Sequence, residues 1–483
     1  MADIKNFQVA DIILEAQQNA LPSRALWKGT VFLRSQGDLY LNKSLFEDTP
    51  QGNEAYLKRL STAVLKPNKY KSTVNYIQGQ LFGKPLMLDY ENVSRNDVKT
   101  FFDSFIEDVD NKGDDWNVFL KTSLKNGLID GISFVMIDTP SFERVGKQIK
   151  INGKILPNTK DTMKKENIRP YWVQIELKDV IDVKVSWAEN GKKEYTRFVY
   201  KETIAEDKNT TKVRIYEYTK EDINIYTQDT NGNATLESHI TNNFGFIPVS
   251  LFICGEPTSD YTALPTLTDL AQLQIAHYNA YSEHQQLMRY DRNPLWLSKD
   301  LEALDENGNK IEVVLGPGAG ISGGPEADLK SVGVDSQSVV QSFQDLEELE
   351  KSMDEYTTAL FTNQNMTAEQ VSLISGSSDS QIKNWATMFK DFIEDLLCNT
   401  AIIGGYNNEE EINYPQVVVN NEFRKPFDYQ LATLTQDMVM NKQLSLKSFL
   451  KILKSMSLEI DVDEELKELG QASSNNFEEP PKE

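Results

Sequence analysis

The chain has 483 residues, too many for one compact core, so we expect several structural regions. Hydrophobic residues make up 39%, which excludes a disordered chain. The formal net charge is -23, from 73 acidic and 50 basic residues. This charge excludes a protein that grips DNA tightly, because such binding comes mostly from Lys and Arg neutralising phosphates. It leaves open a channel through which DNA slides, because an acidic wall repels phosphates.

Neither a membrane span nor a signal peptide is expected. Apolar runs such as Phe134–Ile137 are far shorter than the roughly 20 residues that cross a bilayer, and the first residues lack a basic flank followed by an apolar stretch. Cys254 and Cys398 both lie in apolar contexts, which favours buried free thiols, with a disulfide between them as the alternative.

The first part of the chain is predicted to be mainly helical. Apolar residues recur there at intervals of three and four. The acidic, glycine-containing stretch 108–115 predicts a turn. The predicted helices span residues 9–19, 54–65, 72–82, 97–107 and 116–126.

Short runs of β-branched and aromatic residues follow and predict strands. Asp229-Thr-Asn-Gly-Asn233 mimics the start of a calcium loop, but it lacks Gly at the sixth position and has Ile240 where a bidentate Glu is needed. We interpret it, and likewise 305–309, as a hairpin turn. The predicted strands span residues 132–138, 171–175, 180–185, 196–200, 212–218, 223–226 and 247–253.

Two long amphipathic helices are predicted next, over 265–290 and 336–361, with a glycine-rich β insert between them. Thr266 and Asp269 fit a capping box at the start of the first helix. A helical pair that leaves a domain and returns to it cannot bury both faces alone, so we expect it to pack against other copies in a ring. The apolar stripes are Leu270, Leu273, His277, Ala280, His284 and Leu287 in the first helix, and Val339, Phe343, Leu346, Leu349, Met353, Tyr356 and Leu360 in the second.

The C-terminal part is predicted to begin with a third long helix, 380–403, ended by Gly404-Gly405. A strand at 416–419 is expected to return to the earlier sheet. Helices are then predicted over 428–440, 446–456 and 463–469, before a disordered acidic tail.

No catalytic, metal or cofactor site is predicted. His277 and His284 lie seven residues apart, and that spacing holds a metal only with help from a partner helix, so we interpret them as packing or interface residues. No glycine-rich phosphate loop followed by Lys-Ser/Thr is present in the sequence. Carboxylates are abundant, but no pair of them can be assigned from sequence, which leaves a glycosidase without positive support.

The order of several short motifs resembles tailed-bacteriophage portal proteins, and more narrowly a branch often described only as an uncharacterised phage family. The resemblance extends over residues 25–470 and departs from the family in the run 316–325. The matching pieces are Phe246–Leu251, Leu264–Ala271, His277–Asn279 and Asn293–Leu295, with Gly127–Pro140, Arg169–Tyr171, Met366–Glu369, Gln443–Leu450 and Asp461–Glu465 in the same order.

The resemblance implies an α+β portal fold with wing, stem, clip and crown regions, long stem and wing helices, and a mixed or antiparallel wing sheet. Its regions would be the wing at 1–260, stem helices at 261–290 and 336–361, the clip at 291–335, a tunnel loop at 362–379, a wing helix and strand at 380–426, the crown at 427–470 and the tail at 471–483.

It also implies roles for individual residues. Contacts between subunits in the stem would involve Leu270, Leu273, Leu287, Phe343, Leu346 and Met353. An acidic stem lining would come from Asp345, Glu348, Asp354 and Glu355, although a solvated helix face is an equal alternative. Tunnel-loop residues facing DNA would be Asn363, Gln364, Asn365, Thr367, Ser372 and Ser375, and clip residues facing a partner would be Leu301, Glu302, Asn307 and Asn309.

The resemblance therefore predicts a ring, typically of twelve copies, at one capsid vertex of the virion, made in the cytoplasm of a bacterial host. Double-stranded DNA would pass through it, and terminase, a head–tail adaptor, and the major capsid and scaffold proteins would bind it. A different structural or connector protein of the same particle is the first alternative. An acidic hydrolase is the second, and it requires a pocket with convergent carboxylates.

Overall fold

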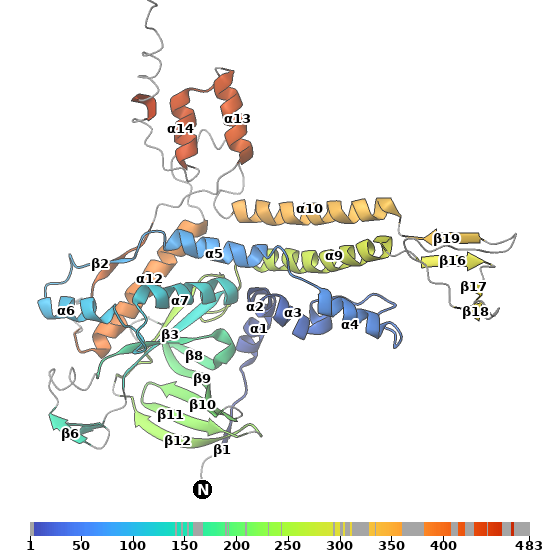
Figure 1. Ribbon diagram of the computed structural model, residues 1–483. Coiled ribbons are helices and arrows are strands. Elements are labelled where there is room, and N and C mark those ends of the chain that lie inside the picture. The colour runs from blue at the N-terminus through green and yellow to red at the C-terminus, as the bar shows by residue number, and fades with distance from the viewer. Residues whose placement is uncertain are drawn as a thin grey trace, which may run out of the picture. The chain divides into compact units, whose positions relative to one another are not determined.

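The fold is described from a computed structural model (Figure 1). It describes residues 4–140, 143–145, 148–151, 154–157, 168–188, 191, 193–207, 210–229, 231–242, 244–292, 295–299, 303–304, 310–311, 328–333, 335–359, 381–406, 414–420, 429–441, 443–455 and 465–467.

Contacts divide the chain into two compact units. Unit 1 contains residues 1–20, 73–266 and 357–483, and unit 2 contains residues 21–72 and 267–356. Residues 21–72 therefore group with the two long helices rather than with the rest of 1–260. The wing, stem, clip and crown assignments themselves stay predictions.

Unit 1 is built on two antiparallel sheets. The larger has the order β1-β12-β11-β10-β9-β8 and the smaller the order β13-β3-β7. All strand pairings between described residues are antiparallel, and the structure is α+β as predicted. Of the two predicted sheet types, mixed or antiparallel, the described strands form the antiparallel one. The bounds are β1 Ile4–Asn6, β3 Ile132–Asp138, β7 Tyr171–Ile175, β8 Val180–Trp187, β9 Lys193–Asp207, β10 Thr210–Thr219, β11 Asp222–Gln228, β12 Asn233–Thr241 and β13 Val249–Ile253.

The core of unit 1 lies where the two sheets face each other. Phe134 of β3 packs against Phe198 of β9, with ring centroids 5.6 Å apart, and α1 (Asp11–Asn19) adds Ile13 to the same cluster. The other face of β3 and β13 is covered by α7 (Trp116–Asp130) and α12 (Gln381–Ile403). The indole of Trp172 in β7 donates to Thr400 Oγ1 of α12 at 2.9 Å, so the buried nitrogen has a partner.

Smaller elements complete unit 1. The strand β20 (Gln416–Val418) pairs with β2 (Met87–Asp89) and not with either large sheet, which corrects its predicted position. A three-stranded sheet has the order β4-β5-β6. The remaining bounds are β4 Glu143–Val145, β5 Gln148–Ile151, β6 Lys154–Pro157, β14 Glu256–Pro257, β15 Ala263–Leu264, α6 Asn96–Phe105, α13 Tyr429–Met440 and α14 Leu446–Ser455.

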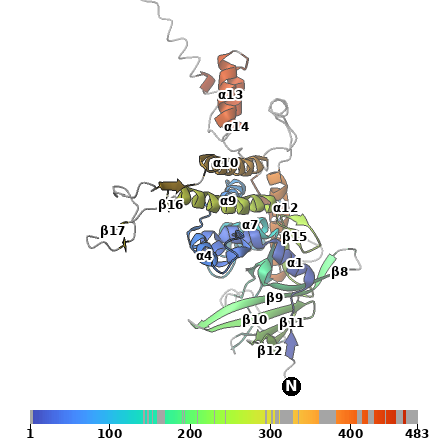
Figure 2. The same cartoon turned by 90° about the vertical axis from the view of Figure 1, so that its right-hand side faces the viewer.

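Unit 2 is a stack of helices in three layers. In two views at right angles, α9 (Thr268–Arg292) lies between α10 (Ser336–Ala359) and a layer formed by α2, α3 and α4 (Figures 1 and 2). Beyond the two long helices, β16 (Leu295–Lys299) pairs with β19 (Asp328–Val332), and β17 (Ala303–Leu304) pairs with β18 (Lys310–Ile311). The first layer comprises α2 Leu21–Lys28, α3 Thr30–Ser35 and α4 Asn53–Thr62; α5, Lys69–Leu81, begins in unit 2 and continues in unit 1.

Several predicted turns are confirmed. Asp229 accepts from the backbone N–H groups of Asn231 and Asn233, at 2.9 and 2.8 Å, and closes the β11–β12 hairpin. Asp110 likewise accepts from Lys112 N and Asp114 N within the 108–115 turn. Gly405 takes a left-handed φ of 73° at the end of α12.

Candidate functional site

The candidate functional site is the helical pair α9–α10, together with the first helical layer that supports α9. Two contacts hold the pair along its length. His277 Nε2 lies 3.3 Å from Glu350 Oε1. Nearer the β16 end of α9, His284 Nδ1 lies 2.8 Å from Ser342 Oγ. Both predicted packing histidines of α9 therefore face α10.

His277 is buried, and its Nδ1 has no hydrogen-bond partner among the described residues. Burial lowers the pKa of His277, and the hydrogen bond to Glu350 opposes this only in part, so the pKa lies below its ordinary value. The neutral imidazole is therefore favoured. Within the described ranges, no group of three or more His, Cys, Asp or Glu side chains is arranged to hold a metal ion.

Two side-chain amides of α9 bind the segments that connect α3 to α4 and α4 to α5. Gln274 accepts from Lys69 N at 2.7 Å and donates to Pro67 O at 3.0 Å. Asn279 accepts from Asn42 N at 2.8 Å and donates to Tyr40 O at 2.9 Å. Both amides are buried. Their hydrogen bonds satisfy backbone N–H and C=O groups that have no partner within a regular helix or strand.

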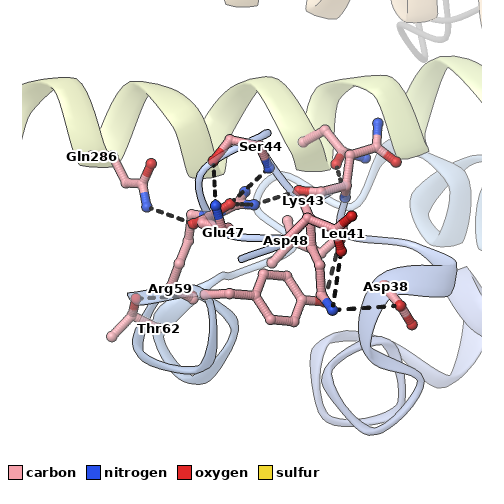
Figure 3. A network of polar contacts seen from close by, with 12 residues as sticks. Asp38, Leu41, Lys43, Ser44, Glu47, Asp48, Arg59, Thr62 and Gln286 are labelled. Carbon is pink, nitrogen blue, oxygen red and sulfur yellow. Dashed lines mark hydrogen bonds and ion pairs between the residues drawn. The ribbon is translucent and has the colours of Figure 1, made fainter. Parts of the chain in front are cut away.

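A buried ion pair fixes the loop 40–52 below α9 (Figure 3). Arg59 of α4 donates from Nε and Nη2 to the two carboxylate oxygens of Glu47, at 2.8 and 2.7 Å, and Nη2 also donates to Asn42 O. Ser44 N donates to Glu47 Oε2 at 3.0 Å, and Gln286 of α9 donates to Glu47 Oε1 at 3.4 Å. The loop is thereby joined to both α4 and α9.

The pKa of Glu47 reflects this surrounding. Burial raises the pKa of the Glu47 carboxyl, but the hydrogen bonds from Arg59 and Ser44 outweigh burial, and the pKa lies below its ordinary value. Glu47 and Arg59 therefore form a charged pair inside unit 2, in the bidentate geometry that Arg favours with carboxylates.

The six residues predicted to pack between subunits fall into three groups. Leu270, Leu346 and Met353 are buried within the single chain, Leu346 being 5% exposed. Leu273 and Leu287 are half-buried. Phe343 is 52% exposed. The three buried residues thus contribute to the core of unit 2, and Phe343 is the most available of the six for contact with another copy.

The four predicted acidic lining residues, Asp345, Glu348, Asp354 and Glu355, are all exposed on α10. Asp354 pairs with Lys69 at 2.8 Å, and Glu355 lies 3.7 Å from Lys351. The predicted tunnel-loop residues 363–375 and the clip residues Leu301, Glu302, Asn307 and Asn309 lie outside the described residues.

Sequence reasoning missed Gln274, Asn279, Glu47 and Arg59. The apolar stripe of α9 draws attention to its leucines, whereas Gln274 and Asn279 bind backbone groups of the connecting segments. A buried amide partner in a loop more than 200 residues away leaves no periodic signal. The unusual density of Gln and Asn on one helix was the only available indication.

Comparisons with known sequences give two findings, and a third observation concerns the helices of the chain itself. A protein-family profile described as "Domain of unknown function (DUF4055)" matches residues 266–401, which include α9, α10 and most of α12. No curated protein matches the chain. In the described part of the chain, no helix has both the length and the apolar character needed to cross a membrane.

Three solved structures similar to this chain come from gene transfer agent (GTA) particles. One is a chain from the virion of the native particle, with 10% identity and a TM-score of 0.36, covering 86% of this chain and 94% of that one. A second, from the neck of the empty particle computed with C6 symmetry, has 10% identity and a TM-score of 0.38 at the same coverages. A third, from the neck of the native particle computed with C12 symmetry, has 10% identity and a TM-score of 0.36, covering 88% and 98%.

Proposed function

We propose that this chain is a portal protein, a non-enzymatic subunit of a ring at one vertex of a phage capsid. The ring would surround a channel for double-stranded DNA during packaging and ejection. The observation that carries the proposal is the helical pair α9–α10, which continues into the paired strands β16 and β19 and has the helices α2, α3 and α4 on its α9 side (Figures 1 and 2).

The exposure of α10 supports this assignment. Among the described side chains of α10, only Leu346 and Met353 are fully buried, whereas Val340 and Phe343 are more than half exposed. Although Asp354 of α10 also pairs with Lys69 of α5, most of the described side chains of α10 are exposed and leave surface for other contacts. In a ring, adjacent copies and the channel would share that surface.

The negative charge of α10 supports a position on the channel wall, where DNA would pass without adhering to the protein. The helix carries six acidic residues and one basic residue. Carboxylates repel the phosphate backbone, so such a wall disfavours adhesion of the polymer. Terminase, a head–tail adaptor, and capsid and scaffold proteins would be the partners at the two ends of the ring.

Electron microscopy of the purified full-length protein tests this proposal. We expect closed rings with a central opening in negative stain. Compact particles without an opening, at every concentration and ionic strength tried, would contradict the proposal and favour a different structural protein.

A further inference from the structure

Unit 2 exposes apolar side chains on a loop whose backbone is firmly held. Leu45 is 95% exposed and Phe46 is 61% exposed. They lie between Ser44 and Glu47. The backbone N–H of Ser44 donates to the Glu47 carboxylate, and the backbone N–H of Glu47 donates to the Ser44 hydroxyl. The Glu47 carboxylate also forms the ion pair with Arg59. We call Leu45 and Phe46 the loop surface.

A second exposed apolar surface lies on α10. Val340 and Phe343 are 56% and 52% exposed and lie three residues apart, on one flank of the helix. We call these two residues the α10 surface. Within unit 2 the first helical layer and α10 lie on opposite sides of α9 (Figures 1 and 2), so the two surfaces belong to different faces of the stack.

Charge distinguishes the two segments that carry these surfaces. Residues 21–72 contain nine basic and four acidic residues, a formal net charge of +5, whereas 336–359 contain one basic and six acidic, a net charge of -5. Some of these charges pair within the chain, as Lys69 does with Asp354. Three exposed lysines of residues 21–72 form no ion pair with a described residue: Lys28, Lys66 and Lys71. Three exposed carboxylates of α10 likewise form no ion pair with a described residue: Asp345, Glu347 and Glu348.

Resting on the proposed function, we propose that the loop surface of one copy docks on the α10 surface of the next copy. The partner is a second copy because one chain supplies both apolar surfaces and both signs of charge. A pairing of α10 with α10 would bring two helices of net charge -5 together, and like charges disfavour that contact. The contact is therefore head-to-tail, and its repetition by a fixed rotation closes a ring.

The held loop suits this role physically. An exposed loop normally loses conformational entropy when it binds, and that loss opposes association. The Glu47–Arg59 pair and the bond from Asn42 N to Asn279 fix the loop before docking. Burial of Leu45 and Phe46 can then contribute to the contact as hydrophobic anchors.

A mixing experiment tests the direction of the contact in the full-length chain. One variant, Leu45→Ser/Phe46→Ser, lacks the loop surface, and the other, Val340→Ser/Phe343→Ser, lacks the α10 surface. Mass photometry is expected to show rings for the wild type, monomers for each variant alone, and a dimer when the two variants are mixed. The dimer forms because the intact loop surface of one variant binds the intact α10 surface of the other. No further copy can add, because the two surfaces left at the ends of the dimer are the substituted ones. Each double variant should weaken assembly at least about tenfold.

The control is Val118→Ser/Met388→Ser, which replaces two exposed apolar residues in unit 1. It should retain rings, and circular dichroism should show that every variant is folded. Rings from both interface variants, or the same loss in the control, would overturn the proposed contact while leaving the portal proposal standing. Absence of rings in the wild type would instead count against the portal proposal.

A cross-linking measurement covers the case in which a serine variant misfolds. Chains carrying Phe46→Cys and Phe343→Cys, each in a Cys398→Ser background and with different tags, are mixed and treated with a short thiol cross-linker. Cys254 is buried and stays in place. We expect cross-links between the two tags in excess of those within either tag; equal yields would overturn the head-to-tail contact.

Discussion

Arg59 and Glu47 form a bidentate ion pair in the interior of unit 2, with nitrogen–oxygen distances of 2.8 and 2.7 Å. Glu47 also accepts from Ser44 N and Gln286, so the carboxylate joins α4, α9 and the loop that carries Leu45 and Phe46. A buried charge of this kind depends on its partner, because water no longer solvates it.

Removal of the guanidinium should strongly destabilise unit 2. Arg59→Met leaves the Glu47 carboxylate buried without its main partner, and we expect a loss of about 3–5 kcal/mol in the free energy of unfolding. The matched control is Lys58→Met, which removes the neighbouring cation from an exposed pair with Glu54, and its effect should stay below about 1 kcal/mol. Urea unfolding measures both; similar losses would contradict a structural role for the buried pair.

The Glu47–Arg59 pair also predicts that the stability of the fold depends on pH in the acidic range. The folded pKa of Glu47 lies below its unfolded value, so its contribution is fully present above the unfolded pKa and is lost as the pH falls through the folded pKa. The stability difference between wild type and Arg59→Met should therefore shrink from neutral pH to about pH 3.5. Urea titrations at both pH values provide the measurement, and an unchanged difference would show that Glu47 keeps its proton state throughout.

His277 predicts that stability also depends on pH in a range nearer neutrality. Its folded pKa lies below the ordinary value of 6.5, so the folded state disfavours the imidazolium. Stability is fully present above the unfolded pKa and is lost as the pH falls through the folded pKa. His277→Gln should reduce the loss of stability between about pH 7.5 and 5.5. His239→Gln in unit 1 controls for removal of a histidine, and an identical profile for both variants would contradict the assignment.

Gly131 tests the packing of unit 1 at the end of α7. Its φ is 79°, and a Cβ atom there would lie 2.8 Å from Leu264 O. Gly131→Ala should cost more than Gly113→Ala, because Gly113 also has a positive φ but no atom within 4 Å of its Cβ position. We expect about 1 kcal/mol from backbone strain at Gly113 and clearly more at Gly131. Thermal unfolding compares the two, and equal losses would show that β15 shifts away freely.

Periodicity predicted the elements well where one face of an element is buried. The strands β3 and β7 begin and end at the predicted residues, and α12 ends at the predicted residue, Ile403. The strand β12 was missed because most of its side chains are exposed and buried residues do not alternate regularly with exposed ones. The helices α2 and α3 were missed because Pro22 and Gly29 interrupt the helical pattern. The first long helix begins at Thr268, three residues later than predicted, and Thr266 Oγ1 donates to Cys254 O.

The candidate site was less predictable than the fold. An apolar stripe shows that residues such as Leu346 and Phe343 prefer burial, but it does not say whether the same chain or another copy buries them. The structure separates the two cases, since Leu346 is buried and Phe343 is not. Gln274 binds Pro67 O across 207 residues of sequence, and Glu47 pairs with Arg59 across only 12. Both are contacts between polar groups, which hydrophobic periodicity does not encode.

Mass per particle is the most direct measurement of the central claim that identical subunits surround a channel. The chain has a mass of 54.9 kDa. Native mass spectrometry of the full-length protein should give a single large oligomer, about 660 kDa for twelve copies, with rotational symmetry in electron micrographs. Monomers or dimers alone, at high protein concentration and over a range of salt, would contradict it.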